Sequence, residues 1–301
     1  MKPKYLASAV LATLLLSTPI SQARAEESRP IAENMELETY RGVSVDGQLR
    51  ATDPMDGTLT YQITTPPIKG EVTLSSDGSF VYTPDPSRRG KDYFGYTATN
   101  SQGTVSQEAT VIITLRKQKT EITYADMEGS PYERDAIRLA EDGIFTGALI
   151  GGDYVFSPDT MISRGEFLAM CMTVSDKDIL SNVTSTGYTD DMDIPQWQKP
   201  YIATARMHGS IRTVSETGST DFQATAPITC AEAAVMVDGI FGLSGVSAAK
   251  LHSNTPDWAA EAVTNLTACR ILPDNCDPAQ YLNRGMTANL LCAVMDIMHA
   301  R

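Results

Sequence analysis

The stretch Ile162-Ser163-Arg164-Gly165-Glu166-Phe167 decides the fold of the C-terminal half, because related stretches recur twice further along the chain. The recurrences are Ile228-Thr229-Cys230-Ala231-Glu232 and Tyr281-Leu282-Asn283-Arg284. In the first two copies a hydroxyl residue stands three positions before a Glu, which is the capping box that begins a helix. The third copy keeps an N-cap residue, Asn283, but loses the Glu. Apolar residues follow each copy at helical spacing, so each copy predicts the start of a helix.

A second helical pattern precedes each of these copies. It has a Trp in two units and a Pro in the first, followed by matching positions at offsets of 4, 5, 8 and 12. The three sets are Trp197 with Tyr201, Ile202, Ala205 and Gly209; Trp258 with Ala262, Val263, Leu266 and Arg270; and Pro131 with Asp135, Ala136, Leu139 and Gly143. These offsets place the residues on one helical face, and a terminal Gly supplies a C-cap. The sequence therefore predicts three helix–loop–helix units at residues 122–180, 186–245 and 252–301, which bury their apolar faces against one another.

The N-terminal half has a different period. Residues 29–116 alternate apolar and polar positions, with turn formers such as Asp56-Gly57 and Asp77-Gly78 between the runs. The predicted strands are 59–63, 71–74, 79–82, 93–98 and 109–115. Several short strands at this spacing predict an antiparallel β-sandwich. Residues 117–121 form a polar linker to the helical units.

The first 25 residues predict a secretion signal. Lys2 and Lys4 precede an apolar run from Tyr5 to Leu16, and Ala23-Arg24-Ala25 is a small-x-small cleavage triplet. The run is shorter than the roughly 20 residues that a membrane span needs, although a retained anchor is the alternative interpretation. Beyond residue 25 the chain has a net charge of about −16, with 37 acidic residues. Such a chain repels nucleic acids, so no nucleic-acid partner and no membrane span are expected.

No pattern of a catalytic or metal site is present in the sequence. The three histidines are scattered, and no nucleophile elbow, phosphate loop or paired cysteine ligand set occurs. We therefore expect no enzyme activity, no catalytic residue, no metal and no cofactor. Of the five cysteines, Cys171 and Cys292 lie in apolar helical runs and are expected in the core. Cys269 and Cys276 are either free thiols or a disulfide pair.

The N-terminal segment resembles the bacterial Ig-like, cadherin-like surface repeats. The resemblance is carried by these stretches: Pro30-Ile31-Ala32-Glu33-Asn34, Ala51-Thr52-Asp53-Pro54, Leu59-Thr60-Tyr61, Gly78-Ser79-Phe80-Val81-Tyr82-Thr83-Pro84 and Ala98-Thr99-Asn100-Ser101-Gln102-Gly103. Some of these relatives bind calcium between repeats. Glu33, Asp53 and Asp56 are the candidate oxygen ligands here, with turn-forming and solvated roles as the alternative.

The helical units resemble S-layer homology (SLH) repeats. The residues that carry the resemblance are Tyr124-Ala125-Asp126, Leu139-Ala140-Glu141-Asp142-Gly143-Ile144, Gly147, Phe156-Ser157-Pro158 and the stretch at 162–167 in the first unit, Tyr188-Thr189-Asp190, Trp197, Phe222 and 228–232 in the second, and Trp258 with 281–284 in the third, the most degenerate. The family implies a pseudo-threefold helix bundle whose grooves bind secondary cell-wall polysaccharide, often through pyruvylated sugars. A cation at a helix start is favourable where an anion joins it, and the alternative is a solvated Arg or one paired with a local Asp.

The resemblance also implies which residues bind the polysaccharide. Arg164 would hold the pyruvyl carboxylate, Asp190 and Trp197 would contact the sugar, and core packing is the alternative role of the Trp. Arg284 with Trp258 would line another groove, and Asp126 and Gly147 are weaker members. Because Cys230 replaces the Arg of the second unit, one or two working grooves are expected.

The predicted architecture is thus an all-β Ig-like/cadherin-like sandwich followed by an α-helical pseudo-threefold bundle of three SLH repeats. The predicted function is noncovalent anchoring of a secreted protein at the cell wall or S-layer, with other surface-layer proteins as further partners. The alternative is an adhesin whose Ig-like domain binds a glycan, a protein or a calcium-dependent partner.

Overall fold

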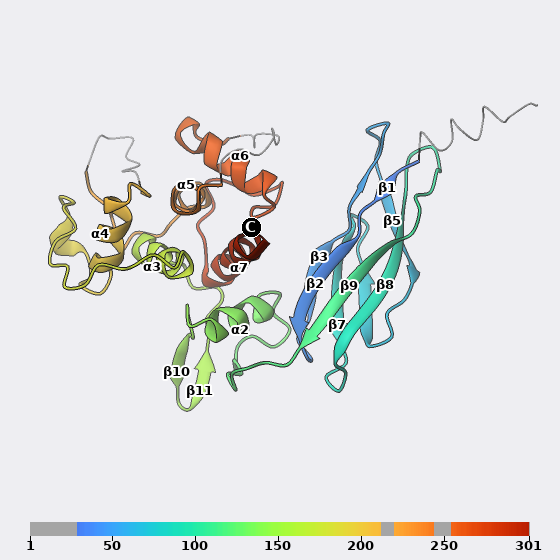
Figure 1. Cartoon of the computed structure of the whole chain (residues 1–301), viewed down its shortest axis with the longest axis horizontal. Helices are drawn as coiled ribbons and strands as arrows, with labels where there is room; N and C mark the ends of the chain where they lie inside the picture. The colour runs from blue at the N-terminus through green and yellow to red at the C-terminus, as the bar shows by residue number, and fades with distance from the viewer. Residues whose placement is uncertain (1–28, 212–219, 244–253, 301) are drawn as a thin grey trace, which may run out of the picture. The chain divides into compact units, whose positions relative to one another are not determined.

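The computed structural model describes residues 29–211, 220–243 and 254–300 (Figure 1). The predicted signal at residues 1–25 lies outside these ranges. Contacts divide the chain into two compact units, one built on residues 45–115 with the segment before Thr39, the other on the chain from Arg116 onward with residues 39–44. Within the described ranges, no helix combines the length and the apolar character needed to cross a bilayer.

The N-terminal compact part of the chain is a β-sandwich of two sheets. One sheet has the order β2-β9-β8-β5, and the other has the order β3-β7-β6. The bounds are β2 Met35–Tyr40, β3 Val45–Gln48, β5 Thr60–Thr65, β6 Gly70–Leu74, β7 Ser79–Pro84, β8 Gly90–Thr99 and β9 Ala109–Arg116. A short pair, β1 Ile31–Ala32 with β4 Ala51–Thr52, completes the unit. All five predicted strands are present as β5 to β9, and the predicted all-β sandwich is confirmed.

Alternate residues of the strands fill the core between the two sheets. Phe80 from one sheet and Phe94 from the other meet edge to face, with ring centroids 5.2 Å apart. The buried carboxylate of Asp92 accepts hydrogen bonds from the Tyr82 hydroxyl and from the backbone amides of Ile68 and Lys69. Burial and this carboxylate raise the pKa of Tyr82. The period-two pattern therefore builds the core as the sequence predicts.

The second compact part of the chain, called the helical unit below, contains three pairs of helices. From here on, the first, second and third units are the parts of the chain that contain these pairs, in sequence order. The first members of the pairs are α2 Glu133–Glu141, α4 Lys199–Met207 and α6 Ala260–Ala268; the second members are α3 Arg164–Val174, α5 Cys230–Phe241 and α7 Arg284–Ala300. Each first member begins two residues after the Trp or Pro position of the sequence pattern. The remaining elements are the hairpin β10 Ala148–Ile150 with β11 Asp153–Val155, and the 3₁₀ turns η1 Asp191–Asp193 and η2 Asp257–Ala259.

The local signals of these helices agree with the sequence. Ser163–Glu166 and Thr229–Glu232 form reciprocal capping boxes, and the Asn283 side chain accepts the Met286 amide. The terminal position has left-handed backbone in all three units, at Gly143, Gly209 and Arg270 (φ +70°, +63° and +63°). Only the third unit places a residue with a Cβ there.

The six helices pack cyclically. Helix α3 contacts both α5 and α7, and each outer helix packs on the second helix of another unit: α4 on α3, α6 on α5 and α2 on α7 (Figure 1). The apolar faces of all three pairs meet in one cluster of buried residues. No pair buries its apolar face alone, as the size of the units predicts.

Backbone hydrogen bonds close a ring just before the second helices. The amide of Ile162 donates to the carbonyl of Leu282, that of Leu282 to Ile228, and that of Ile228 to Ile162, at 3.0–3.2 Å. Equivalent positions of the three units therefore bind one another in a cycle. The three helix pairs are thus joined to one another by a closed ring of backbone hydrogen bonds.

Candidate functional site

The cycle creates three equivalent junctions, each between the start of one second helix and the loop that precedes another. Junction 1–2 joins the start of α3 to residues 222–227, junction 2–3 joins the start of α5 to residues 276–281, and junction 3–1 joins the start of α7 to residues 156–161. The sequence-predicted site residues Arg164 and Arg284 stand at the helix starts of two of these junctions.

The helix-start amides are already bonded to protein at all three junctions. The first two amides of each helix donate to loop carbonyls three and five residues before the N-cap of another unit, at 2.8–3.0 Å. The pairs are Arg164 to Ala226 and Gly165 to Ala224, Cys230 to Gln280 and Ala231 to Pro278, and Arg284 to Thr160 and Gly285 to Pro158. The expectation that these amides join an Arg to bind an anion is therefore corrected, because loop carbonyls occupy them.

Arg164 is buried in junction 1–2. Its Nη1 lies 2.7 Å from Oε1 of Glu232, and its Nε donates to the carbonyl of Phe222 at 3.0 Å. The guanidinium also lies over the Phe222 ring, 5.5 Å from the centroid. The other oxygen of Glu232 completes the capping box of α5. The structure thus pairs Arg164 with an acid, but the acid is Glu232 of another helix pair and not the local Asp that the sequence suggests.

Asp126 and Asp190 shape the loops that face the two arginines. Both oxygens of Asp190 accept backbone amides, from Phe222 at 2.9 Å and Gln223 at 2.7 Å. Asp126 repeats this arrangement with Phe156 at 2.9 Å and the residue after it at 2.6 Å. Each carboxylate holds the loop whose Phe carbonyl is contacted by Arg164 or Arg284. Both of its oxygens already accept backbone amides.

Arg284 is the counterpart of Arg164 in junction 3–1, but its surroundings differ. Its Nη1 donates to the carbonyl of Phe156 at 3.2 Å, and the guanidinium lies 5.4 Å from the centroid of Phe145. The side chain is half-buried, and within the described part of the chain no acid forms an ion pair with it. Arg284 therefore keeps donors for a ligand, whereas Arg164 is neutralised.

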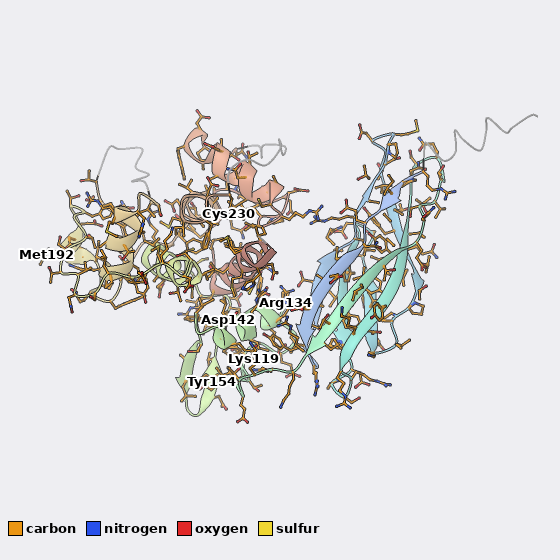
Figure 2. The ribbon with its side chains drawn as sticks, in the orientation of Figure 1. Lys119, Arg134, Asp142, Tyr154, Met192 and Cys230 are labelled. Carbon is orange, nitrogen blue, oxygen red and sulfur yellow. A yellow bond between two sulfur atoms is a disulfide. The ribbon has the colours of Figure 1, made fainter. Side chains whose placement is uncertain are left out.

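Junction 2–3 has a disulfide in place of the arginine. Cys230 bonds to Cys276 (Cys230 is labelled in Figure 2). The predicted alternatives for Cys276, a free thiol or a bond to Cys269, are both wrong, since Cys269 is free. Cys276 stands seven residues before its N-cap, the position that Phe156 and Phe222 occupy in the other units. Cys171 and Cys292 are buried, as expected, and burial raises the pKa of both thiols.

The two tryptophans belong to different junctions. Trp197 is 55% exposed beside junction 1–2, and Trp258 is 38% exposed at junction 2–3. Trp258 lines a pocket of about 290 Å³ together with Thr229, Glu232, Asn254, Pro256 and Pro278, among others. The structure does not bring Arg284 and Trp258 together, because Arg284 contacts the loop of the first unit. The core-packing alternative does not hold for side chains this exposed.

In two units, the residue that follows the Trp or Pro of the sequence pattern packs on a Gly at the second position of a helix, in α3 and in α7. A Cβ on Gly165 would lie 2.0 Å from Oε1 of the buried Gln198, and one on Gly285 would lie 2.3 Å from the Tyr132 ring. Gly147 is also positional, since its φ is +72° and a Cβ would lie 2.4 Å from the carbonyl oxygen of Val155. The structure thus gives Gly147 a backbone role at the start of the β10–β11 hairpin.

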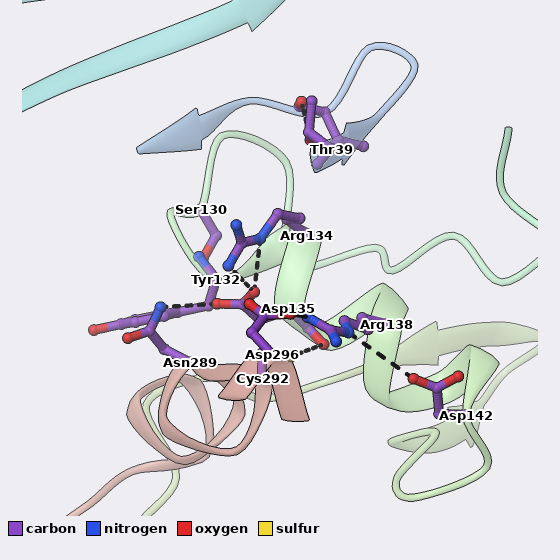
Figure 3. A network of polar contacts seen from close by, with 11 residues as sticks. Thr39, Ser130, Tyr132, Arg134, Asp135, Arg138, Asp142, Asn289, Cys292 and Asp296 are labelled. Carbon is purple, nitrogen blue, oxygen red and sulfur yellow. Dashed lines mark hydrogen bonds and ion pairs between the residues drawn. The ribbon is translucent and has the colours of Figure 1, made fainter. Parts of the chain in front are cut away.

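Polar contacts close the cycle between α2 and α7 (Figure 3). Asp135, only 1% exposed, pairs with Arg134 and accepts a hydrogen bond from Asn289 at 2.9 Å. Arg138 forms ion pairs with Asp296 at 2.6 Å and with Asp142 at 4.0 Å. Of these contacts, Asp135 with Asn289 and Arg138 with Asp296 tie α2 to α7, so they serve the packing of these helices rather than a ligand.

Two of the three calcium candidates of the sandwich, Asp53 and Asp56, belong to one turn. Oδ1 of Asp53 accepts the amide of Met55 at 3.3 Å, and Oδ2 accepts that of Gly57 at 3.0 Å. Asp56 has left-handed backbone (φ 51°) within the same turn. Over residues 29–211, 220–243 and 254–300, no group of three His, Cys, Asp or Glu side chains is arranged to hold a metal ion.

Comparison with known proteins gives one family match. No curated protein matches the chain. Similar solved structures include an endo-fucoidan hydrolase from glycoside hydrolase family 107 (21% identity, 29% of this chain and 16% of that chain, TM-score 0.25). Others are a SusE-like surface located polysaccharide binding protein from Bacteroides thetaiotaomicron (20% identity, 32% and 16%, TM-score 0.24) and an SrpA adhesin mutant from Streptococcus sanguinis (17% identity, 33% and 62%, TM-score 0.25).

These structural likenesses are too weak to indicate a function. All three TM-scores lie below 0.5, and the chain spans only 14–16% of the length of the first three structures. The SLH interpretation of the helical unit stays a prediction, because the family match ends at residue 117. The match is to the bacterial cadherin-like domain, so the corresponding prediction is confirmed: residues 27–117 form a domain of that family.

Proposed function

We propose that the chain is a non-catalytic surface protein, secreted by its N-terminal signal, whose three helical units are SLH repeats that bind secondary cell-wall polysaccharide. The observation that carries this proposal is the cyclic set of junctions, in which equivalent backbone bonds recur three times. The cadherin-like domain would serve as a spacer or as a contact with other surface-layer proteins.

Junction 3–1 is the best candidate for holding a carboxylate of the polysaccharide. Arg284 is half-buried, has no ion-pair partner among the described residues, and lies beside the aromatic ring of Phe145. A guanidinium binds a carboxylate through two parallel hydrogen bonds, which a Lys cannot reproduce. Arg164 is the weaker candidate, since a ligand carboxylate would have to displace Glu232 from it. We therefore assign ligand binding to Arg284 and an architectural role to Arg164.

The test is a pull-down of the mature chain with purified cell-wall sacculi, before and after acid treatment that strips the secondary polysaccharide. Wild-type protein should bind intact walls and not stripped ones. Arg284→Ala should weaken binding by roughly 10- to 100-fold, the loss of a charge-assisted hydrogen-bond pair, with an unchanged melting temperature. Arg284→Lys should recover only part of the loss.

Arg164→Ala is the matched control. It removes the same side chain from an equivalent junction but exposes a partly buried Glu232, so its main effect should be a lower melting temperature. Equal binding to intact and stripped walls would refute the anchoring function. If only Arg164→Ala weakened binding at a temperature where it is folded, the assignment of Arg284 would be wrong.

A further inference from the structure

Three differences coincide at junction 2–3, and together they leave it without the Arg and the Glu that the other two junctions have at the equivalent positions. Each of the other junctions has an Arg at the helix start, a Phe in the facing loop, and a Glu at the third position of the helix that follows that loop. Those sets are Arg164, Phe222 and Glu232, and Arg284, Phe156 and Glu166; the set of junction 2–3 is Cys230, Cys276 and Met286. Loss of the Arg alone would leave the Glu without its counter-charge, which is costly near a protein interior. Junction 2–3 therefore has neither the Arg nor the Glu found at these positions of the other two junctions, and Glu232 in the first turn of α5 is the ionisable group that lines its pocket.

The disulfide keeps the loop in place without the arginine. In the other two junctions the arginine side chain holds the loop by contacting a Phe carbonyl and lying near an aromatic ring. In junction 2–3 the bond between Cys230 and Cys276 makes this connection covalently. The loop carrying Pro278 and Ala279 is thereby fixed as one wall of the pocket.

The lining of the pocket defines the kind of ligand that fits. Trp258, Pro256 and Pro278 provide flat, apolar surface, and Thr229, Glu232 and Asn254 provide hydrogen-bonding groups. Among the residues that the structure describes, no Lys, Arg or His lines the pocket, and the one ionisable lining group, Glu232, is acidic, so these residues offer an anionic ligand no counter-charge. Its volume of about 290 Å³ is near the lower end of the roughly 300–1,000 Å³ of ligand sites, which suits a single ring.

We propose that this pocket binds an uncharged sugar ring, with one CH face on Trp258 and hydroxyl groups directed to Glu232 and Asn254. The proposal rests on the proposed function and makes it more specific, because the polysaccharide would contact the protein through two kinds of residue. A charged sugar would bind at Arg284, and a neutral one would bind at junction 2–3. A Cys pair in place of an Arg and a Phe would therefore change the specificity of a junction rather than abolish its binding.

The chain offers a direct test, because it contains only two tryptophans and they lie at different junctions. In the full-length Trp197→Phe variant, Trp258 is the sole indole and reports junction 2–3 alone. The probes are methyl N-acetylglucosaminide and the same glycoside carrying a 4,6-pyruvyl ketal, which differ by one carboxylate. The neutral glycoside should change Trp258 emission in a saturable way and bind at least fivefold more tightly than the pyruvylated one. The matched Trp258→Phe variant should show no response to the neutral probe.

The result that overturns the proposal is equal or tighter binding of the pyruvylated glycoside at Trp258, or no response to the neutral probe. Dithiothreitol, which opens the Cys230–Cys276 bond, should weaken neutral binding, and an unchanged affinity after verified reduction would contradict the role of the disulfide. Arg284→Ala should lose wall binding and keep the Trp258 response. If the protein failed to bind walls but Trp258 still responded to the neutral probe, only the anchoring function would be refuted. If the protein bound walls but Trp258 did not respond, only this inference would be refuted.

Discussion

Removing the Cys230–Cys276 disulfide should destabilise the helical unit by a calculable amount. The two residues are 46 positions apart, and they connect the start of α5 to the loop before α7. Closing a loop of that length lowers the entropy of the unfolded chain by an amount worth about 4 kcal/mol at 25 °C in the chain-entropy description. Engineered and native bonds often deliver less, so about 2–4 kcal/mol is expected for Cys230→Ala with Cys276→Ala.

Urea unfolding followed by tryptophan emission is the suitable assay. Trp197 and Trp258 both lie in the helical unit, so emission reports this unit and not the cadherin-like domain. Adding dithiothreitol to the wild type should shift the midpoint as far as the double variant does, and should leave the variant unchanged. Cys269→Ala is the control, because it removes a thiol that is free.

Alkylation of the native protein checks the pairing independently. Cys171 and Cys292 are buried with raised thiol pKa values, so only Cys269 should react before reduction, and Cys230 and Cys276 should react after it. If the double variant unfolded at the same urea concentration as the oxidised wild type, the argument that this bond holds junction 2–3 would be refuted.

Three further predictions concern single positions. Arg270→Gly should raise the free energy of unfolding by about 0.5–1 kcal/mol in urea titrations, because Arg270 has a φ of +63°. Gly285→Ala should lower it by about 1–3 kcal/mol through overlap with the Tyr132 ring, and Tyr132→Ala in the same chain should restore much of the loss. Hydrogen bonds from Lys199 and Thr186 lower the pKa of Asp191 to about 2, so the stability that its carboxylate provides is complete above about pH 4 and disappears as the pH falls through 2. Melting temperatures of wild type and Asp191→Asn should therefore differ at neutral pH and converge near pH 2; a constant difference would contradict this assignment.

The sequence predicts the local features of the fold because their causes are local. Capping boxes, the helix starts at Arg164 and Arg284, and the strand alternation around Phe80 and Phe94 each depend on residues a few positions apart. The structure contains all of them. A small core divided among three repeated units could also be inferred, since no single unit has enough apolar surface.

Contacts between units could not be inferred in the same way. The pairing of Arg164 with Glu232 spans two units, and nothing near either residue shows which unit packs on which. The disulfide illustrates the same limit, since Cys269 is the nearest partner for Cys276 in sequence but Cys230 is the nearest in space. A signal did exist, because Cys276 aligns with the Phe positions once the units are placed in register. Reading it requires knowing that the Arg and Phe positions of different units touch.

The closed ring of backbone bonds has a consequence for how the chain acquires its structure during synthesis. The cadherin-like domain has all its strands before residue 117, so it can fold while the rest of the chain is still being made. The ring instead needs Leu282, and the first helix pair needs α7 as a neighbour, so the helical unit stays open until its last helix has been translated. Helix α2 and the backbone ring therefore wait for the end of the chain, and loss of α7 would leave the apolar face of α2 in water.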